Sequence, residues 1–188
     1  MSKIMEPLTD LELIEEVRSG KRQAFTELMR RHQERIYWAA RRILGDHADA
    51  DDVTQETFVK AFLNLGEFRG DASFFTWIYR IAINLSLNAL RKRHLINYLR
   101  ESELALKVFP STEDPHRDLE AKEMESLIAR AVTTLPDKQR AVFVMRYYDQ
   151  MSYEEIAYVL KTSVGGLKAN YFHALHKVQE YLKNATTD

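Results

Sequence analysis

The chain has 188 residues, 45% of them hydrophobic, which is enough for one large core or two smaller ones. It contains no cysteine, which excludes disulfide frameworks and thiolate metal sites, and its formal net charge of −1 argues against a surface that binds polyanions over its whole extent. No segment approaches the roughly 18 apolar residues of a membrane span, and the N-terminal residues do not resemble a signal peptide. We therefore expect a cytoplasmic protein.

The N-terminal part of the chain is predicted to begin with two helices. Thr9 and Glu12 have the spacing of a capping box, which starts a short helix that Gly20 ends. From Lys21 onwards apolar residues recur at helical spacing, and Gly45 closes this second, longer helix. Both helices are amphipathic, so each is expected to bury one face against a neighbour.

Carboxylates are concentrated at the start of a third predicted helix. They are Asp46, Asp49, Asp51, Asp52 and Glu56. A helix N-terminus favours negative charge, which explains several of them. Their spacing matches no metal-binding loop, and His47 alone does not make a zinc site, so no metal site is expected. The polar face that continues through Gln55 is either simply solvated or a docking surface for a basic partner.

A fourth predicted helix follows a loop with two glycines that contains Phe68. Trp77 belongs to its core stripe, whereas Phe75 and Tyr79 lie off that stripe beside cationic residues. An exposed Phe68 could stack on an unpaired base, and aromatics interleaved with arginines are typical of a surface for single-stranded nucleic acid. The helix is predicted to end in the basic run at residues 91–94.

Residues 95–117 are predicted to form a linker, because their periodicity is weak and Pro110 and Pro115 bracket a run of small polar residues. Helical patterns return afterwards, with one helix from Leu119 and another that has Pro136 as its first residue. Strand signals are nearly absent. The sequence predicts an all-α fold of two helical domains, residues 1–94 and 118–188, joined by this flexible linker.

The last two predicted helices are separated by a short turn. Ser152 and Glu155 form a second capping box, and Ser163 is the N-cap of a long final helix. This arrangement fits a helix-turn-helix, whose second helix enters a DNA major groove, while an ordinary helical hairpin in a bundle is the alternative.

No combination of residues predicts catalysis. The chain has no cysteine nucleophile, no glycine-rich phosphate loop and no Gly-x-Ser-x-Gly turn. We therefore expect a protein that is not an enzyme, with no catalytic residues and no cofactor. A helix-turn-helix repressor or activator is the second hypothesis, and an enzyme acting on nucleic acid is the third.

Four segments, in the right order, resemble conserved segments of the bacterial extracytoplasmic-function (ECF) sigma factors. They are Ala50–Phe58, Phe68–Asn84, Leu135–Phe143 and Ser152–Gly165. The resemblance covers nearly the whole chain outside the linker and termini. It implies that residues 1–94 are sigma region 2 and residues 118–188 are sigma region 4, in a subunit that binds core RNA polymerase and directs initiation at promoters. An anti-sigma factor is a further implied partner.

The resemblance also implies roles for particular residues. The polymerase would be bound by Asp49, Asp51, Asp52, Gln55 and Glu56. The minus-ten element would be contacted by Phe68, Arg69, Phe75, Tyr79, Arg80, Asn84, Arg91, Lys92 and Arg93. The minus-thirty-five element would be contacted by Ser163, Val164, Gly165, Lys168, Asn170, Phe172 and His173. The chain departs from many relatives in one turn, where it has Lys161 in place of glycine.

Overall fold

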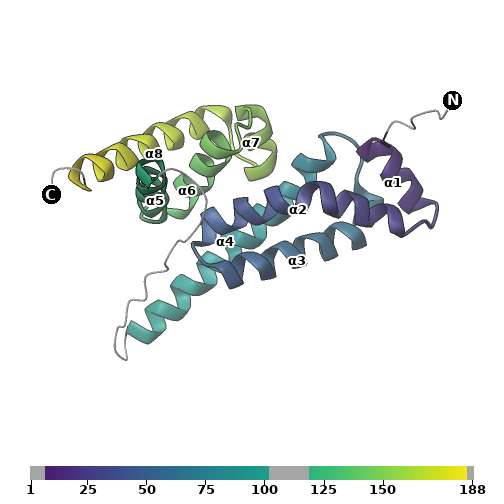
Figure 1. Cartoon of the computed structure of the whole chain (residues 1–188), viewed down its shortest axis with the longest axis horizontal. Coiled ribbons are helices and arrows are strands. Elements are labelled where there is room, and N and C mark those ends of the chain that lie inside the picture. Colours follow the sequence, from purple (N-terminus) through teal and green to yellow (C-terminus); the bar gives the residue numbers. More distant parts are fainter. Residues whose placement is uncertain (1–6, 102–118, 186–188) are drawn as a thin grey trace.

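The computed structural model describes residues 7–101 and 119–185, which form two groups of helices that pack against each other (Figure 1). Within these ranges every regular element is helical, which confirms the predicted all-α fold. Residues 102–118, which include most of the predicted linker, lie outside the described residues.

The N-terminal half consists of a bundle and a short helix across one end of it. The bundle helices are α2 (Gln23–Leu44), α3 (His47–Leu63) and α4 (Phe74–Glu101), and α1 (Asp10–Arg18) lies against α2. A 3-10 turn, η1 (Leu65–Glu67), leads from α3 towards α4. The bundle buries one apolar stripe of each helix, including Leu28, Ile36, Phe58, Ile78 and Ile83. Thr9 caps α1 in the predicted capping box.

The fourth helix is longer than predicted. It continues through the basic run to Glu101, so the prediction that it ends at residue 94 is wrong. Its last turns expose Leu95, Tyr98 and Leu99 to solvent, and this absence of an apolar stripe explains why the sequence pattern gave no helical signal there.

The C-terminal half consists of α5 (Leu119–Thr133), α6 (Asp137–Phe143), α7 (Tyr153–Leu160) and α8 (Val164–Ala185). The prediction that Pro136 is the first residue of α6 is wrong by one position, because Pro136 is the N-cap of this helix. A π-helical turn, η2 (Val144–Tyr148), follows α6 and has no signal in the sequence. Such turns are rare and often lie at functional sites.

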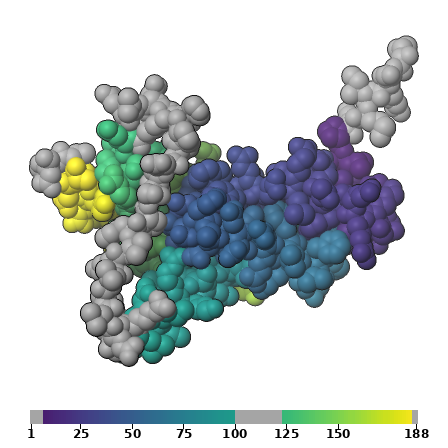
Figure 2. Space-filling view, turned by 60° about the horizontal axis from the view of Figure 1, so that its bottom comes forward, coloured from purple at the N-terminus to yellow at the C-terminus, as the bar shows by residue number. Residues whose placement is uncertain are grey.

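The two halves meet along α4, against which α7 packs, and at the C-terminal end of α2 (Figures 1 and 2). Arg140 of α6 donates from Nη1 to the Ile43 carbonyl oxygen at 2.8 Å, and from Nη2 to the carbonyls of Thr133 and Leu135. The last carbonyls of a helix have no donor within the helix, so Arg140 satisfies one of them from the other half of the chain. The buried side chains of both halves form one continuous core.

The turn between α7 and α8 contains backbone strain at Lys161. Its φ of 51° and ψ of 48° are left-handed, a conformation that costs a residue with a β-carbon about 1–2 kcal/mol. We expect Lys161→Gly to raise the free energy of unfolding by about 1 kcal/mol, measured by urea denaturation. Lys177→Gly, within α8, is the control and should lower it by about 1 kcal/mol. A destabilised Lys161→Gly variant would contradict the strain argument.

Candidate polymerase and nucleic-acid interface

The helix-turn-helix has the capping that its sequence predicted. Ser152 Oγ accepts from the Glu155 backbone N–H at 3.2 Å, and the Glu155 carboxylate accepts from the Ser152 N–H at 2.8 Å. Ser163 Oγ accepts from the Gly166 N–H at 3.3 Å at the start of α8. These caps fix where α7 and α8 begin, and the apolar face of α8 is then buried at Leu167 and Ala174.

The opposite face of α8 is open to solvent. Lys168, Phe172 and His173 are exposed, and Phe172 is 64% accessible although it is large and apolar. Asn170 is less available, because its Nδ2 donates to the Gly166 carbonyl at 2.8 Å. The exposed side chains have the spacing of one helix face and can reach into a groove together.

The acidic and polar residues of α3 divide into two groups by their exposure. Asp49 pairs with Arg93, and Asp51 faces His47 at 3.5 Å. Asp52, Gln55 and Glu56 are exposed, and Glu56 pairs with Lys60 at 3.0 Å. The second group is therefore the part of this face that is open to a partner.

The exposed face of α3 continues with two apolar residues that the sequence interpretation did not assign to it. Val59 is 58% exposed and Leu63 is 74% exposed. They follow Asp52 and Glu56 at helical spacing, which is the signal that would have placed them on the same face. A large exposed apolar group beside polar ones is typical of a protein-binding surface.

The predicted exposure of Phe68 is wrong. Only 5% of its surface is accessible, and its ring packs edge-on against Phe74 and Trp77 at centroid distances of 5.9 and 5.5 Å. Such ring pairs add stabilisation to the burial of aromatic area, which explains why the loop folds inwards. Trp77 is buried as predicted.

Arg18 of α1 holds this loop, a role that the sequence interpretation missed. Its Nη2 donates to the carbonyl oxygens of Leu65 and Phe68 at 3.1 and 2.6 Å, and its Nη1 pairs with Glu15 at 2.9 Å. A basic residue in the last turn of a helix is ordinary, so the sequence carries no sign of an acceptor about 50 positions away.

Tyr79 is also buried, against the prediction that it lies off the core. Its Oη donates to Asp149 Oδ2 of the other half at 2.5 Å, and none of its surface is accessible. Burial raises the pKa of the Tyr79 phenol well above its ordinary value and also raises the pKa of the Asp149 carboxyl. The reason for the wrong prediction is that Tyr79 belongs to a core completed by the C-terminal half.

The other residues assigned to the minus-ten element differ in availability. Arg69, Asn84, Arg91 and Lys92 are exposed. Phe75 is partly buried beneath the Arg35 guanidinium, whose carbon lies 3.7 Å from the ring centroid. Arg93 is occupied by the Leu44 carbonyl and by Asp49. The exposed group forms a polar and cationic strip along the loop and α4.

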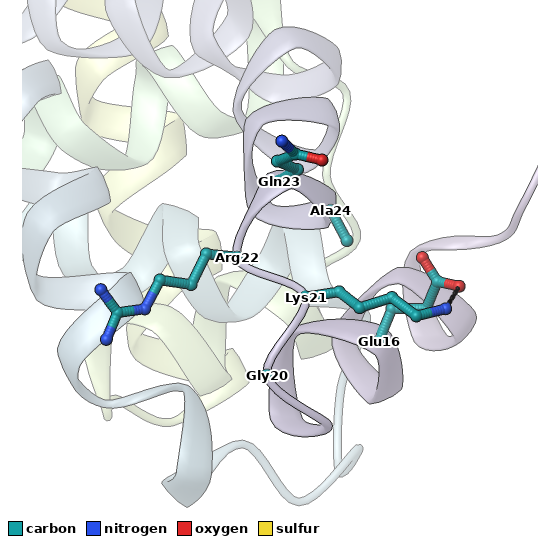
Figure 3. A pocket seen from close by; sticks show the side chains of 6 residues that line it. All are labelled: Glu16, Gly20, Lys21, Arg22, Gln23 and Ala24. Carbon is teal, nitrogen blue, oxygen red and sulfur yellow. Dashed lines mark hydrogen bonds and ion pairs between the residues drawn. The ribbon is translucent and has the colours of Figure 1, made fainter.

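Two cavities are bordered by the N-terminal half, and the larger of them also borders the C-terminal half. One, of about 640 Å³, is lined by the loop residues 66–71 together with Trp77, Arg80 and Tyr158. The other, of about 420 Å³, lies at the turn between α1 and α2 (Figure 3). There Lys21 is paired with Glu16 at 2.8 Å and Arg22 points away, so this turn offers no free converging charges.

Residues 7–101 and 119–185 contain neither a metal site nor a membrane-spanning helix. No three His, Asp or Glu side chains come together there as a metal site. No helix in these ranges is both long and apolar enough to cross a membrane.

Comparison with known proteins identifies the family. Residues 28–96 match the family described as Sigma-70 region 2, and residues 125–178 match Sigma-70, region 4. The RNA polymerase sigma-H factor of Pseudomonas aeruginosa is 33% identical over 189 residues, covering 93% of this chain and 94% of the relative. The ECF RNA polymerase sigma-E factor of Escherichia coli K12 is 34% identical over 181 residues, covering 90% and 92%. The chain belongs to the ECF sigma factors.

Solved structures agree with this sigma factor fold. CnrH, in complex with the cytosolic domain of CnrY, is 27% identical with a TM-score of 0.68, covering 92% of this chain and 96% of that one. The sigma factor RpoE of Bartonella quintana, in complex with the anti-sigma factor NepR, has a TM-score of 0.69 at 21% identity, covering 85% and 96%. The second likeness supports the fold alone.

Membership of the ECF sigma factor family decides between the sigma factor, the repressor or activator, and the nucleic-acid enzyme. A sigma factor binds core RNA polymerase and directs promoter-specific initiation at minus-ten and minus-thirty-five elements, and it is not an enzyme. The repressor and the nucleic-acid enzyme are therefore set aside for this chain.

The contact between Arg18 and the loop generates a prediction for this sigma factor. In Arg18→Ala, amides of residues 65–70 should exchange with deuterium about tenfold faster, because a hydrogen bond from a charged donor contributes about 1.5 kcal/mol or more. Exchange measured by mass spectrometry tests this. The control Glu15→Ala removes the ion pair but leaves both donors, and should exchange as the wild type does. Equal rates in all three proteins would contradict the role of Arg18.

Proposed function

We propose that the two halves divide the work of promoter recognition. Residues 1–94 form the region 2 domain, residues 95–117 connect the halves, and residues 118–188 form the region 4 domain. The helix α4 extends from the first domain into the connecting segment as far as Glu101. The family matches at residues 28–96 and 125–178 support this division. The sigma factor acts in the cytoplasm, since its partners are core polymerase and promoter DNA.

The exposed face of α3 is proposed to bind the polymerase. The exposure of these acidic, polar and apolar side chains on one helix face is the main observation behind the proposed function. Asp52, Gln55 and Glu56 present acidic and polar groups, and Val59 and Leu63 extend the surface with apolar area. Charge steers a basic partner and apolar area supplies affinity, so this combination suits a protein docking surface. Asp49 and Asp51 support it from its edge through their pairs with Arg93 and His47.

The loop around Phe68 and the exposed strip of α4 are proposed to hold the melted minus-ten strand. Extruding a base costs a few kcal/mol, and the open cavity beside residues 66–71 offers a flipped base a place next to the loop. Phe68 then forms the floor of this site and not a stacking platform, while Arg69, Arg91 and Lys92 bind phosphates. Asn84 supplies amide hydrogen bonds and Arg80 adds a partly exposed cation, whereas Phe75, Tyr79 and Arg93 are packed or paired inside the structure and support this surface from beneath.

The exposed face of α8 is proposed to read the minus-thirty-five element. Lys168, Phe172 and His173 are the base-edge candidates, and Asn170 contributes after leaving the Gly166 carbonyl. The backbone amides at Ser163, Val164 and Gly165 bind phosphate at the helix N-terminus.

An anti-sigma factor is the proposed regulator. Support comes from the two solved relatives, which are described as complexes of a sigma factor with an anti-sigma factor and of CnrH with the cytosolic domain of CnrY. The Phe172 and Leu63 side chains are apolar surfaces that such a partner can cover.

Charge reversal on α3 tests the polymerase-binding face. We expect Asp52→Lys to weaken binding to core polymerase by about tenfold and to reduce transcription in vitro, because it places a cation against a basic partner. Affinity is measured with labelled sigma factor and core enzyme. Glu180→Lys, an equivalent reversal on the exposed surface of α8, should leave the affinity unchanged. Equal core binding by wild type and Asp52→Lys would remove Asp52 from the interface.

Truncation on α8 tests the minus-thirty-five assignment. Lys168→Ala should reduce discrimination between promoters by about 1–3 kcal/mol without changing the melting temperature, since the side chain is exposed. Transcription from a promoter library by the holoenzyme measures this. Lys177→Ala, on the same helix but half a turn around it, is the control and should retain discrimination. If Lys168→Ala lowers the melting temperature as well, its role is structural.

A further inference from the structure

The exposed Lys168 side chain on α8 lies over an aromatic ring of α7. Its Nζ is 5.7 Å from the centre of the Tyr153 ring. A cation within about 6 Å of a ring centre, over the ring face, is attracted by the negative charge of that face. Tyr153 is the first residue of α7 and Lys168 lies near the start of α8, so the contact joins the two helices of the helix-turn-helix.

The Tyr153 ring is itself held in place. It is partly buried and packs against the core, and the capping box at Ser152 fixes the backbone immediately before it. Arg146 lies in the π turn η2, and its Nη1 donates to the Met151 carbonyl oxygen at 2.8 Å. Its guanidinium carbon lies 5.1 Å from the centre of the Tyr153 ring. The ring is therefore a fixed support for a longer and more flexible side chain.

The contact leaves the charge and the donors of Lys168 available. Among the residues that the structure describes, no carboxylate forms an ion pair with Lys168. An ammonium group has three donors, and a carboxylate would occupy at least one of them and cancel the charge, whereas a ring face does neither. A lysine side chain also loses rotamer freedom when it binds, so a support that holds it beforehand lowers the cost of binding.

We propose that Tyr153 is a positioning residue for minus-thirty-five recognition, and that its ring holds the Lys168 ammonium group where it can donate to a base edge in the major groove. The inference rests on the proposed function, which makes Lys168 a reader of base edges. Guanine presents two acceptors in the major groove, O6 and N7, and is the base that suits a lysine. Tyr153 should therefore affect discrimination at the base that Lys168 contacts and leave the other positions of the element unchanged.

Transcription by the holoenzyme from promoters that carry each single-base change in the element tests this. We expect Tyr153→Leu to reduce discrimination about two- to fivefold at the base position where Lys168→Ala acts, since an exposed contact between a cation and a ring accounts for that range. Tyr153→Phe keeps the ring and should retain discrimination. The control is Tyr181→Leu, the same substitution at a partly buried tyrosine about 20 Å further along α8, and it should behave as the wild type does.

A double-mutant cycle separates positioning from a contact that Tyr153 makes by itself. In the Lys168→Ala background, Tyr153→Leu should cause no further loss of discrimination. An equal loss in both backgrounds would overturn the inference, because Tyr153 would then act without Lys168. A loss in Tyr153→Phe as large as that in Tyr153→Leu would also overturn it, because the hydroxyl and not the ring would be the functional group.

A substitution that preserves the shape of the ring keeps the test valid if Tyr153→Leu does not fold. A trifluorinated phenylalanine in place of Tyr153 withdraws electron density from the ring face and weakens its attraction for a cation. Discrimination should be lower than in Tyr153→Phe, with the melting temperature unchanged. Equal discrimination by these two variants would overturn the role of the ring.

Proton NMR on the full chain measures the contact directly. The ε-methylene protons of Lys168, identified by their absence in Lys168→Ala, should be shifted upfield by the ring. Tyr153→Leu should remove this shift and Tyr181→Leu should keep it. A wild type in which these protons resonate with those of the other lysines would overturn the contact.

Failure of the proposed function is distinguished by Lys168→Ala alone. If Lys168→Ala keeps full discrimination, Lys168 does not read a base, and the proposed function of this residue and the role of Tyr153 both fall. If Lys168→Ala loses discrimination while Tyr153→Leu keeps it, the proposed function stands and only the positioning role of Tyr153 is overturned. Loss in both, without additivity in the cycle, supports both proposals.

Discussion

The carbonyl groups at the C-terminal end of α2 constrain how the two halves are arranged. A helix end leaves its last carbonyls without donors, and in this chain two of them lie where water is largely excluded. Arg140 donates to Ile43 and Arg93 donates to Leu44, so one donor comes from the C-terminal half and one from α4. Removing a donor from a buried carbonyl costs its desolvation, which ties the position of α6 to the end of α2.

That constraint places the π-helical turn against the N-terminal bundle. The turn follows α6 directly, and it carries Tyr148 to Arg42 and leads Asp149 to Tyr79. A π turn closes its hydrogen bonds over one residue more than an α-helical turn does, so side chains after it point in other directions than they would after a regular α-helix. This change of direction determines which of them face α2 and α4. The contact between the halves thus follows from local backbone geometry and not from apolar burial alone.

The sequence predicts the elements whose signals are local. Ser152 and Glu155 lie three positions apart, and Asp52 and Gln55 lie on one helical face, so their capping and exposure follow from spacing. Phe68 and Tyr79 were misplaced because their surroundings are completed by distant residues. The period of α4 carries no information about Asp149, which is 70 positions further along the chain.

The arginines show the same difference between features that follow from neighbouring residues and features that depend on distant ones. From the sequence, a basic run at the end of α4 is a phosphate-binding surface. In the structure Arg93 is withdrawn from that run by Asp49 and the Leu44 carbonyl, while Arg91 and Lys92 remain exposed. With a net charge of −1 and part of its cationic surface used internally, the sigma factor offers few free cations to DNA phosphates. In the proposed function, the assembled polymerase then has to supply most of the promoter affinity.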